Sequence, residues 1–321
     1  MLTSRPSLPS SIPLVLDLDG TVIRTDTFHE MMAYLLMQKP LILLRLPFWF
    51  LKGRAYAKAQ LVEHTDINVK HLPYNALLLS FAQQATEEGR PLILATGTDQ
   101  KLAQKISDHL GIFQEVIGSD GVINMTGHQK RHALLDRFGI HGFDYAGDSP
   151  VDAIVWQVSR EALVVYPKWG VLKKARALKD SELIHYIPRE KARTLSFLLA
   201  LRPLFWVFNL MMASMSLFIG FSLLVSGLLI VGDLVNLEKD RRRGLGQSVF
   251  AQGHLHLSTA FVLAPMLILL SFSFLFLSPG GLFLGAYIPL FIGLDRLTRC
   301  TPQLLRWILL GLFQILTAML V

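Results

Sequence analysis

The sequence predicts an α/β domain with a doubly wound parallel sheet and a helical cap, followed by an all-α transmembrane domain. Apolar runs alternate with helical segments through the first half, which is typical of a parallel sheet covered by helices on both faces. Charged residues are then absent from 203–231 and from 257–294. Because about 20 apolar residues suffice to cross the hydrocarbon core of a bilayer, these runs predict membrane spans.

Four short apolar runs are predicted as buried strands, at 14–18, 91–95, 143–146 and 162–166. Four helices are predicted in the same region, at 75–89, 99–110, 130–138 and 150–158. Asp99 is the expected N-cap of the second of these helices. Parallel sheets bind ligands at the carboxyl ends of their strands, so polar motifs at those ends become candidate site residues.

Residues 25–72 interrupt this alternation after the first strand and are predicted to form a cap over the site. The segment 35–51 within the cap is strongly apolar, but Lys39, Pro40, Arg45 and Pro47 interrupt it. A spanning helix is therefore not expected. Two structures remain open for this segment: an interfacial segment that rests on a bilayer, or a buried cap helix that packs on the core domain.

The expected domain boundaries are 1–166 for the α/β domain, 167–196 for a basic linker and 197–321 for the membrane domain. The linker is rich in lysine and arginine. Such a run forms either a solvated surface or a region attracted to anionic lipid, and both can hold at once. Cys300 is the only cysteine, which excludes an intramolecular disulfide and agrees with a reducing compartment.

Four motifs at predicted strand ends contain the residues that phosphoryl transfer requires. In chain order, they contain Asp17, Asp19 and Thr21, then Thr96 and Gly97, then Lys130, and finally Asp148 and Asp152. Each motif alone is common in surface turns. Together they indicate a site, because a carboxylate attacks phosphorus only where other groups neutralise and orient the phosphate.

The carboxylates of the first motif predict a phosphatase. Asp17 is the expected nucleophile, which forms an aspartyl-phosphate. Asp19 would protonate the leaving alkoxide and then activate water. A general base beside the nucleophile argues against an ion-pumping ATPase, whose phosphorylated intermediate must survive.

The remaining motif residues are expected to bind phosphate and a cation. Thr21, Thr96 and the backbone amides near Gly97 would hold phosphate oxygens, and Lys130 would offset their charge. Asp148 and Asp152 offer hard oxygen ligands. With the Asp17 carboxylate and the Asp19 carbonyl, they predict a Mg²⁺ site.

At these positions the chain resembles the haloacid dehalogenase (HAD) superfamily of phosphohydrolases, over roughly residues 12–160. Asp17, Asp19 and Thr21 match its first motif, Thr96 its second, Lys130 its third, and Asp148 with Asp152 its fourth. The resemblance implies a HAD-like, Rossmannoid fold with a helical cap inserted after the first motif. It leaves the substrate open, because caps vary and set specificity.

The membrane half resembles the start of a UbiA-type prenyltransferase domain, at 201–209 and 232–243. Asp233 and Asp240, with Asn236 between them, would form a degenerate site for a prenyl pyrophosphate. The alternative is a cytoplasmic loop that obeys the positive-inside rule. Gly232 and Asn236 replace an Asn and an Asp of the family motif, and the second aspartate-rich motif is absent, which predicts a truncated, motif-degenerate domain.

The apolar run 203–231 is difficult to place as one span. Its 29 residues would give a helix of roughly 44 Å at about 1.5 Å per residue, too long for one upright span. One long span and two short ones both remain open, and we favour a compressed hairpin. Further spans are expected at 258–277, 282–294 and 304–321.

The sequence therefore predicts a Mg²⁺-dependent phosphomonoester hydrolase tethered to the inner membrane, with the hydrolase domain in the cytoplasm. A phosphorylated sugar or polyprenyl intermediate is the expected substrate, the bilayer is the expected partner, and no nucleic acid is expected. The UbiA resemblance implies the alternatives, a polyprenyl or phosphoribosyl transferase or a non-catalytic membrane anchor for the phosphatase.

Overall fold

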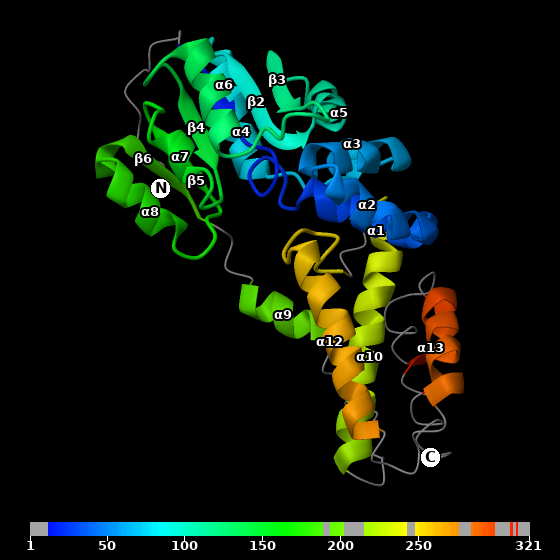
Figure 1. Cartoon of the computed structure of the whole chain (residues 1–321). Helices are drawn as coiled ribbons and strands as arrows, with labels where there is room; N and C mark the ends of the chain where they lie inside the picture. The colour runs from blue at the N-terminus through cyan, green and yellow to red at the C-terminus, as the bar shows by residue number, and fades with distance from the viewer. Residues whose placement is uncertain are drawn as a thin grey trace. The chain divides into compact units, whose positions relative to one another are not determined.

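The computed structural model of the chain describes residues 12–188, 193–201, 215–242, 248–275, 284–298, 309–310 and 313. The chain divides into two compact units, Met1–Lys191 and Ala192–Val321. Figure 1 shows the helices and strands of each unit.

The first unit is built on a six-stranded sheet in the order β3-β2-β1-β4-β5-β6, and every neighbouring pair of strands is parallel. The strands are β1 (Leu14–Leu16), β2 (Leu92–Asp99), β3 (Glu115–Ser119), β4 (Asp144–Gly147), β5 (Ala162–Val165) and β6 (Ile184–Ile187). The strand order reverses between β1 and β4. A crevice forms at such a reversal, outside the carboxyl ends of the strands.

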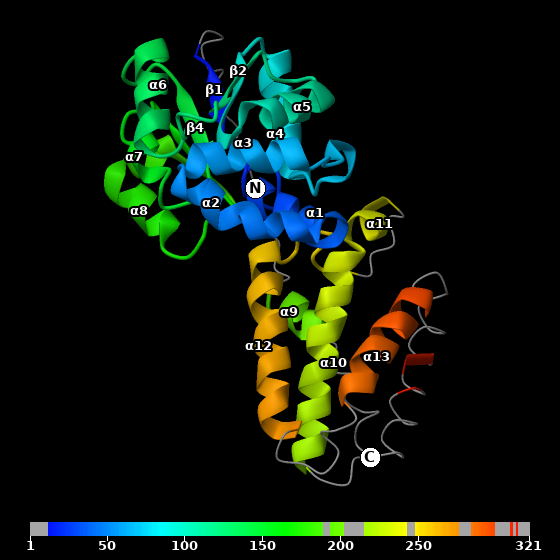
Figure 2. The ribbon, with the colours of Figure 1, turned by 45° about the vertical axis from the view of Figure 1, so that its right-hand side comes forward.

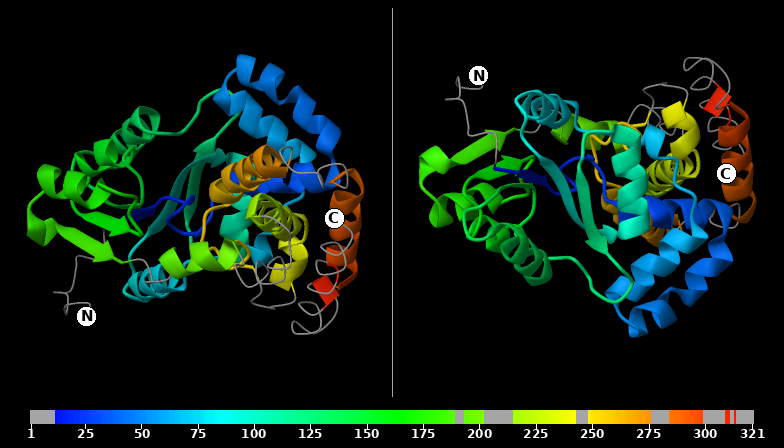
Figure 3. Two further views of the ribbon diagram at one scale, coloured as in Figure 1. Left: turned by 90° about the horizontal axis from the view of Figure 1, so that it is seen from below. Right: turned by 90° about the horizontal axis from the view of Figure 1, so that it is seen from above.

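Helices cover both faces of this sheet, as Figure 3 shows. The helices α4 (Ala76–Glu87) and α5 (Gln100–Leu110) pack on the face that Leu14 and Leu16 enter. The other face, which Val15 enters, is covered by α6 (His128–Phe138), α7 (Ala153–Trp156) and α8 (Val171–Leu178). This arrangement confirms the predicted doubly wound sheet, because successive side chains of a strand point to opposite faces.

The insertion between β1 and α4 is helical. It consists of α1 (Thr27–Gln38), η1 (Pro40–Arg45), α2 (Leu46–Leu51), α3 (Arg54–His64) and η2 (Val69–His71). Pro40 and Pro47 occupy the first turns of η1 and α2, where a missing N–H costs least, and they divide the apolar segment 35–51 into short helices. Trp49 is buried, but most of the large apolar residues next to it in the sequence are exposed.

The sequence analysis predicted a basic linker at 167–196, but the structure has regular secondary structure in this segment. It contains α8, η3 (Ser181–Leu183) and β6, and β6 pairs with β5 at the edge of the sheet. The sequence analysis also missed the other edge strand, β3. Both edge strands are less buried than the central strands, so their apolar pattern is weak.

The described part of the second unit is helical, with α9 (Arg193–Leu201), α10 (Met215–Val235), α11 (Leu237–Arg242), α12 (Leu257–Leu275) and α13 (Leu284–Thr298). Two helical segments are long and apolar enough to span a membrane, Phe218–Val235 and Leu257–Leu275. Residues 215–231 form one continuous helix rather than a hairpin. Residues 203–214, and most of the span expected at 304–321, lie outside the described residues.

Two glycines let α10 and α12 approach each other closely (Figure 2). A Cβ atom on Gly220 would lie 2.7 Å from Leu275 Cγ, and one on Gly227 would lie 2.7 Å from Ile268 Cγ1. Because the earlier glycine meets the later residue, the two helices run antiparallel. Small residues at such contacts are typical of helices that pack within membranes.

Candidate active site

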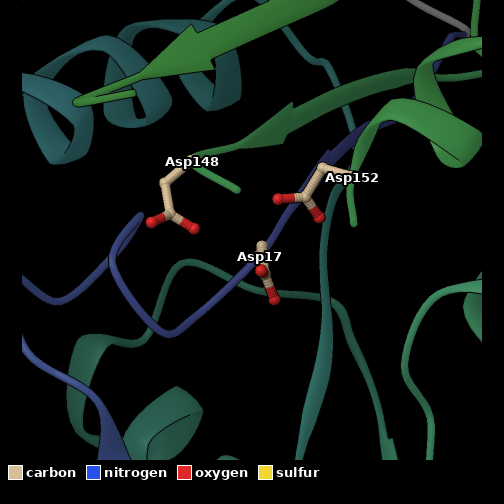
Figure 4. Close-up of side chains that lie close together, drawn as sticks. All are labelled: Asp17, Asp148 and Asp152. Atoms are coloured by element: carbon tan, nitrogen blue, oxygen red, sulfur yellow. The ribbon is translucent and has the colours of Figure 1, made fainter. Parts of the chain in front are cut away.

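Asp17, Asp148 and Asp152 meet at the carboxyl ends of β1 and β4, where the strand order reverses. All three side chains are almost fully buried, and one carboxylate oxygen from each lies within 4.8 Å of the others. Figure 4 shows the three carboxyl groups gathered around one space. The sequence analysis placed these three residues in one site, and the fold brings them together.

The loop after β1 places Asp17 beside Asp148. Asp17 N–H donates to the Ala146 carbonyl of β4 at 3.0 Å, which fixes the end of the strand. Gly20 then turns the chain with a φ of 77°, and a Cβ atom there would lie 2.5 Å from Asp148 Oδ2. Only glycine satisfies both requirements, because other residues rarely adopt this φ and would displace the carboxylate.

A chain of buried hydrogen bonds links the candidate nucleophile to the candidate metal ligands. Lys130 Nζ donates to Asp17 Oδ1 at 2.8 Å and to the Tyr145 hydroxyl at 2.8 Å. The Tyr145 hydroxyl donates in turn to Asp152 Oδ1 at 2.8 Å. Ser149 donates its N–H and its hydroxyl to Asp152 Oδ2 at 2.9 and 2.8 Å. These contacts hold both carboxylates in fixed positions.

The crowding of carboxylates changes their titration. Burial raises the pKa of Asp17 to about 6, although the Lys130 ammonium opposes the rise. Burial also raises the pKa of Asp148 to about 7, against the charge of Lys168, while Asp152 and Asp17 add to the rise. Burial alone would lower the pKa of Lys130, but Asp17 and Asp152 raise it. A divalent cation among the three carboxylates would relieve their mutual repulsion.

Asp19 is held by the beginning of α1 and by the end of β2. Thr27 N–H donates to Asp19 Oδ1 at 2.7 Å, and Thr98 Oγ1 donates to Asp19 Oδ2 at 2.8 Å. Burial raises the pKa of Asp19 to about 6, the charge of Asp26 adds to the rise, and these hydrogen bonds oppose it. A carboxyl group with this pKa can give and take a proton near neutral pH, as a general acid and base must.

The predicted phosphate-binding residues lie in the same region. Among the described residues, the buried Thr21 hydroxyl has no hydrogen-bond partner, so it is available to form a hydrogen bond with a ligand. Thr96 Oγ1 accepts from Thr98 N–H at 3.1 Å. The Gly97 carbonyl accepts from Ser119 Oγ at 2.9 Å, which fixes the backbone near the end of β2.

Sequence reasoning missed Lys58, which reaches the site from the cap. Lys58 Nζ donates to the Gly97 carbonyl at 2.5 Å and to Asn124 Oδ1 at 3.0 Å. It thus joins α3 to the end of β2, which carries Thr96. Burial lowers the pKa of Lys58, although Asp19, Asp26 and Asp17 oppose the fall.

Tyr145, Thr98 and Lys168 were also missed. Lys168 had been assigned to the linker, but its Nζ lies 3.0 Å from Asp148 Oδ2. Thr98 carried a signal, since it lies two residues after Thr96 and before the predicted helix N-cap. Tyr145 and Lys168 carried none, because only the tertiary fold brings them to the carboxylates.

The predicted prenyl-pyrophosphate residues lie in the second unit. Asp233 is buried near the end of α10, Asn236 Nδ2 donates to the Gly232 carbonyl at 2.9 Å, and Asp240 follows on α11. Among the described residues, Asp17, Asp148 and Asp152 form the one group of three side chains close enough to share a metal ion. Asp233 and Asp240 do not belong to a group of this kind among the described residues.

Comparisons with known proteins found one similar curated sequence and several similar solved structures. No family model matches the chain. An uncharacterised protein of Sinorhizobium fredii is 32% identical over 249 residues, which are 72% of this chain and 48% of that protein. The chain thus spans about half the length of the curated relative that it matches.

Three solved structures illustrate the similarity in fold. A HAD-family hydrolase of Salmonella enterica serovar Typhi has a TM-score of 0.40 and 14% identity, and the match covers 56% of this chain and 69% of that one. A substrate-bound phosphoserine phosphatase has a TM-score of 0.40 and 13% identity, covering 58% and 96%. A predicted phosphoglycolate phosphatase of Haemophilus somnus has a TM-score of 0.39 and 13% identity, covering 60% and 99%.

Proposed function

We propose that the first unit is a Mg²⁺-dependent phosphomonoester hydrolase that works through an aspartyl-phosphate on Asp17. The observation that carries the proposal is the pairing of Asp17 with Lys130 at 2.8 Å, next to Asp148 and Asp152. Asp19 lies two residues farther along the same loop, with a pKa of about 6. A nucleophile, a cation, a general acid and a metal-binding group thus occur together at one strand reversal.

The first chemical step transfers the phosphoryl group to the protein. A carboxylate oxygen of Asp17 forms a bond to phosphorus while the bond from phosphorus to the ester oxygen breaks. Protonated Asp19 donates its proton to the leaving alkoxide. Lys130 stays beside Asp17 and stabilises the negative charge on the phosphoryl oxygens.

The second step releases phosphate. Asp19, now a carboxylate, takes a proton from water, and the water oxygen bonds to phosphorus as the bond to the Asp17 oxygen breaks. Inorganic phosphate leaves and Asp17 is regenerated. Thr27 and Thr98 orient Asp19 for both steps through hydrogen bonds to its two carboxylate oxygens.

Asp17, Asp148 and Asp152 fit a Mg²⁺ ion. Their carboxylates are the hard oxygen ligands that Mg²⁺ prefers. Burial raises the pKa of both Asp17 and Asp148, and a bound cation would oppose this rise. Bound Mg²⁺ would neutralise the phosphate and let it approach three carboxylates.

We further propose that the second unit holds this hydrolase at the cytoplasmic face of the membrane. Phe218–Val235 and Leu257–Leu275 support membrane insertion, and the basic residues Arg241 and Arg242 after α10 support a cytoplasmic position for that end. A phosphorylated sugar or polyprenyl phosphate at the membrane surface is the substrate class that this location favours.

The experiment is phosphate release by the full chain, purified in detergent, from a panel of sugar phosphates and polyprenyl phosphates with Mg²⁺. We expect activity that EDTA removes and that Asp17→Asn lowers by at least about 10³-fold. Asp233→Asn is the matched control in the second unit and should retain activity. Absence of phosphate release, or equal release by Asp17→Asn, would contradict the proposal.

A further inference from the structure

The cap carries an exposed apolar surface that the catalytic site does not use. It is formed by large side chains from the end of α1, from η1 and from α2. The members of this apolar cap surface are Leu36, Leu41, Leu44, Phe48, Phe50 and Leu51. Leu41, Leu44, Phe48 and Leu51 are the most exposed, at 79%, 71%, 67% and 84%. Large apolar groups gathered in this way mark an interaction surface rather than scattered exposure.

The same segment also has a buried side, which holds the surface in place. Trp49 is 7% exposed and packs against His64 of α3, with ring centroids 5.1 Å apart. Leu35 is fully buried. Figure 2 shows α1, α2 and α3 alongside one another. The exposed side chains are therefore presented by a folded cap, one side of which packs inward.

Every charged residue within the segment 31–62, which carries the apolar cap surface, is basic. From 31 to 62 the sequence contains no Asp or Glu. Lys39, Arg45, Lys52 and Arg54 are all exposed in this segment. Lys39 Nζ also donates to the His64 carbonyl at 3.0 Å, and Lys52 Nζ lies 5.0 Å from the Tyr56 ring centroid, so both stems lie along the cap. The four cations thus alternate with the exposed apolar residues along the sequence, and the segment 31–62 contains no carboxylate.

We propose that this surface docks onto a lipid bilayer that contains anionic headgroups. Apolar and aromatic side chains next to basic residues are the composition of segments that lie in a membrane interface. The leucine and phenylalanine side chains enter the boundary between headgroups and acyl chains, and the four cations contact lipid phosphates. The Phe218–Val235 and Leu257–Leu275 helices of the same chain are compatible with a nearby bilayer.

A second copy of the chain is a poorer occupant. Self-association through this surface would bring two sets of Lys39, Arg45, Lys52 and Arg54 together. Like charges facing each other across an interface oppose association. An anionic bilayer has the opposite charge and an apolar interior, so it complements both features of the surface. This inference concerns the cap alone and does not depend on the phosphatase mechanism.

The test uses the full chain in lipid nanodiscs, with Cys300→Ser to remove the native thiol. A fluorophore is attached to Leu44→Cys in one sample and to Ile140→Cys in another. Ile140 is a matched control, because it is an apolar residue of the same unit with 68% exposure and precedes β4, at the amino ends of the strands. The nanodiscs contain phosphatidylcholine with or without phosphatidylglycerol, and their acyl chains are brominated to quench a fluorophore that reaches them.

We expect quenching at position 44 to exceed that at position 140 by at least about threefold in phosphatidylglycerol nanodiscs. Removal of phosphatidylglycerol, or the pair Arg45→Gln and Lys52→Gln, should reduce the quenching at position 44. Equal quenching at both positions would overturn the proposal. So would a blue-shifted but unquenched fluorophore at position 44, which would show that protein covers the surface. Mixing with unlabelled chain would then distinguish a second copy from the chain's own helical unit.

Discussion

The two units of this chain both bury carboxylates, but among the described residues three carboxylates lie close enough to share a metal ion only in the first unit. In the first unit, Asp17 contacts Lys130, and Asp148 contacts Lys168. In the second unit, Asp233 and Asp295 are buried on α10 and α13. The described residues beside Asn236 and Asp295 enclose a cavity of only about 20 Å³.

The proposed function therefore rests on the gathering of carboxylates in the first unit rather than on their burial. Burial is common to both units. In the first unit, several carboxylates and cationic side chains meet at one strand reversal, and the absence of a side chain at Gly20 lets Asp148 keep its position there. The comparison predicts that changes in the first unit alter phosphate release and that changes in the second unit alter stability.

The largest expected effect in this comparison is the loss of the general acid and base. Asp19→Asn keeps the shape of the side chain and can keep its hydrogen bonds, but it cannot exchange the proton. We expect kcat to fall by about 10³-fold, since general acid and base catalysis contributes about 10² to 10⁴. Phosphate-release kinetics measure this, with the exposed Asp120→Asn as a control. A loss of less than tenfold would contradict the assigned role.

A second prediction separates structural carboxylates of the first unit from catalytic ones. Asp144 is buried and accepts hydrogen bonds from Arg160 Nε at 2.9 Å and from Arg90. Breaking a buried pair on one side leaves buried charge uncompensated, so Asp144→Asn should cost about 3 kcal/mol of unfolding free energy. Denaturant unfolding measures it. Asp66→Asn, which removes an exposed pair with Lys105, should cost below about 1 kcal/mol.

The same residue predicts a pH dependence. Burial would raise the pKa of Asp144, but the hydrogen bonds and charges of Arg160 and Arg90 hold it below its ordinary value. Its stabilisation is therefore present above the unfolded-state pKa of about 3.9 and is lost as pH falls through the lower folded-state pKa. Acid unfolding should show this loss in the natural chain and not in Asp144→Asn.

Much of the candidate site could be predicted because its motifs are local. Asp17, Asp19, Asp148 and Asp152 each follow a strand, and the rule for parallel sheets places strand ends together. Glycines and the N-cap at Asp99, which accepts from Lys101 N–H at 3.0 Å, mark the same boundaries. The doubly wound fold followed from the alternation of strands and helices.

The missed features depend on contacts distant in sequence or on weak patterns. Lys58 reaches Gly97 only because the cap folds over the sheet, and the segment that contains β6 was read by its charge rather than by its apolar pattern. In the second unit, residues 215–231 form part of one helix, and the remainder of the predicted hairpin, 203–214, lies outside the described residues. Length and hydropathy alone could not distinguish these structures.

A third prediction concerns the second unit by itself. Gly227→Ala places a Cβ atom 2.7 Å from Ile268 Cγ1 and 3.1 Å from the Ala264 carbonyl. We expect it to lower the stability of the helical unit by about 1 to 3 kcal/mol, as overpacking does. Thermal unfolding in detergent measures this. Gly293→Ala, which meets no atom within 4 Å, is the matched control and should not destabilise. If Gly227→Ala lost phosphate release below its unfolding temperature, the expected separation between activity in the first unit and stability in the second would be contradicted.

The smallest predicted effect concerns the link between cap and core. Lys58→Met removes the hydrogen bonds to Gly97 and Asn124 but keeps an apolar stem. We expect kcat/KM to fall by about tenfold, because a hydrogen bond of this kind contributes about 1 to 2 kcal/mol to the position of the end of β2. Lys101→Met, at an exposed lysine on α5, should retain activity. An equal effect of both variants would show that Lys58 acts only through surface charge.

The central claim is that Asp17 becomes phosphorylated during turnover. The most direct measurement is rapid acid quenching of the full chain during phosphomonoester hydrolysis, followed by mass spectrometry of its peptides. The account predicts one phosphoryl group on the peptide that contains Asp17, and none on that peptide in Asp17→Asn. Steady turnover without a phosphoryl group on Asp17, or the same modification in Asp17→Asn, would contradict it.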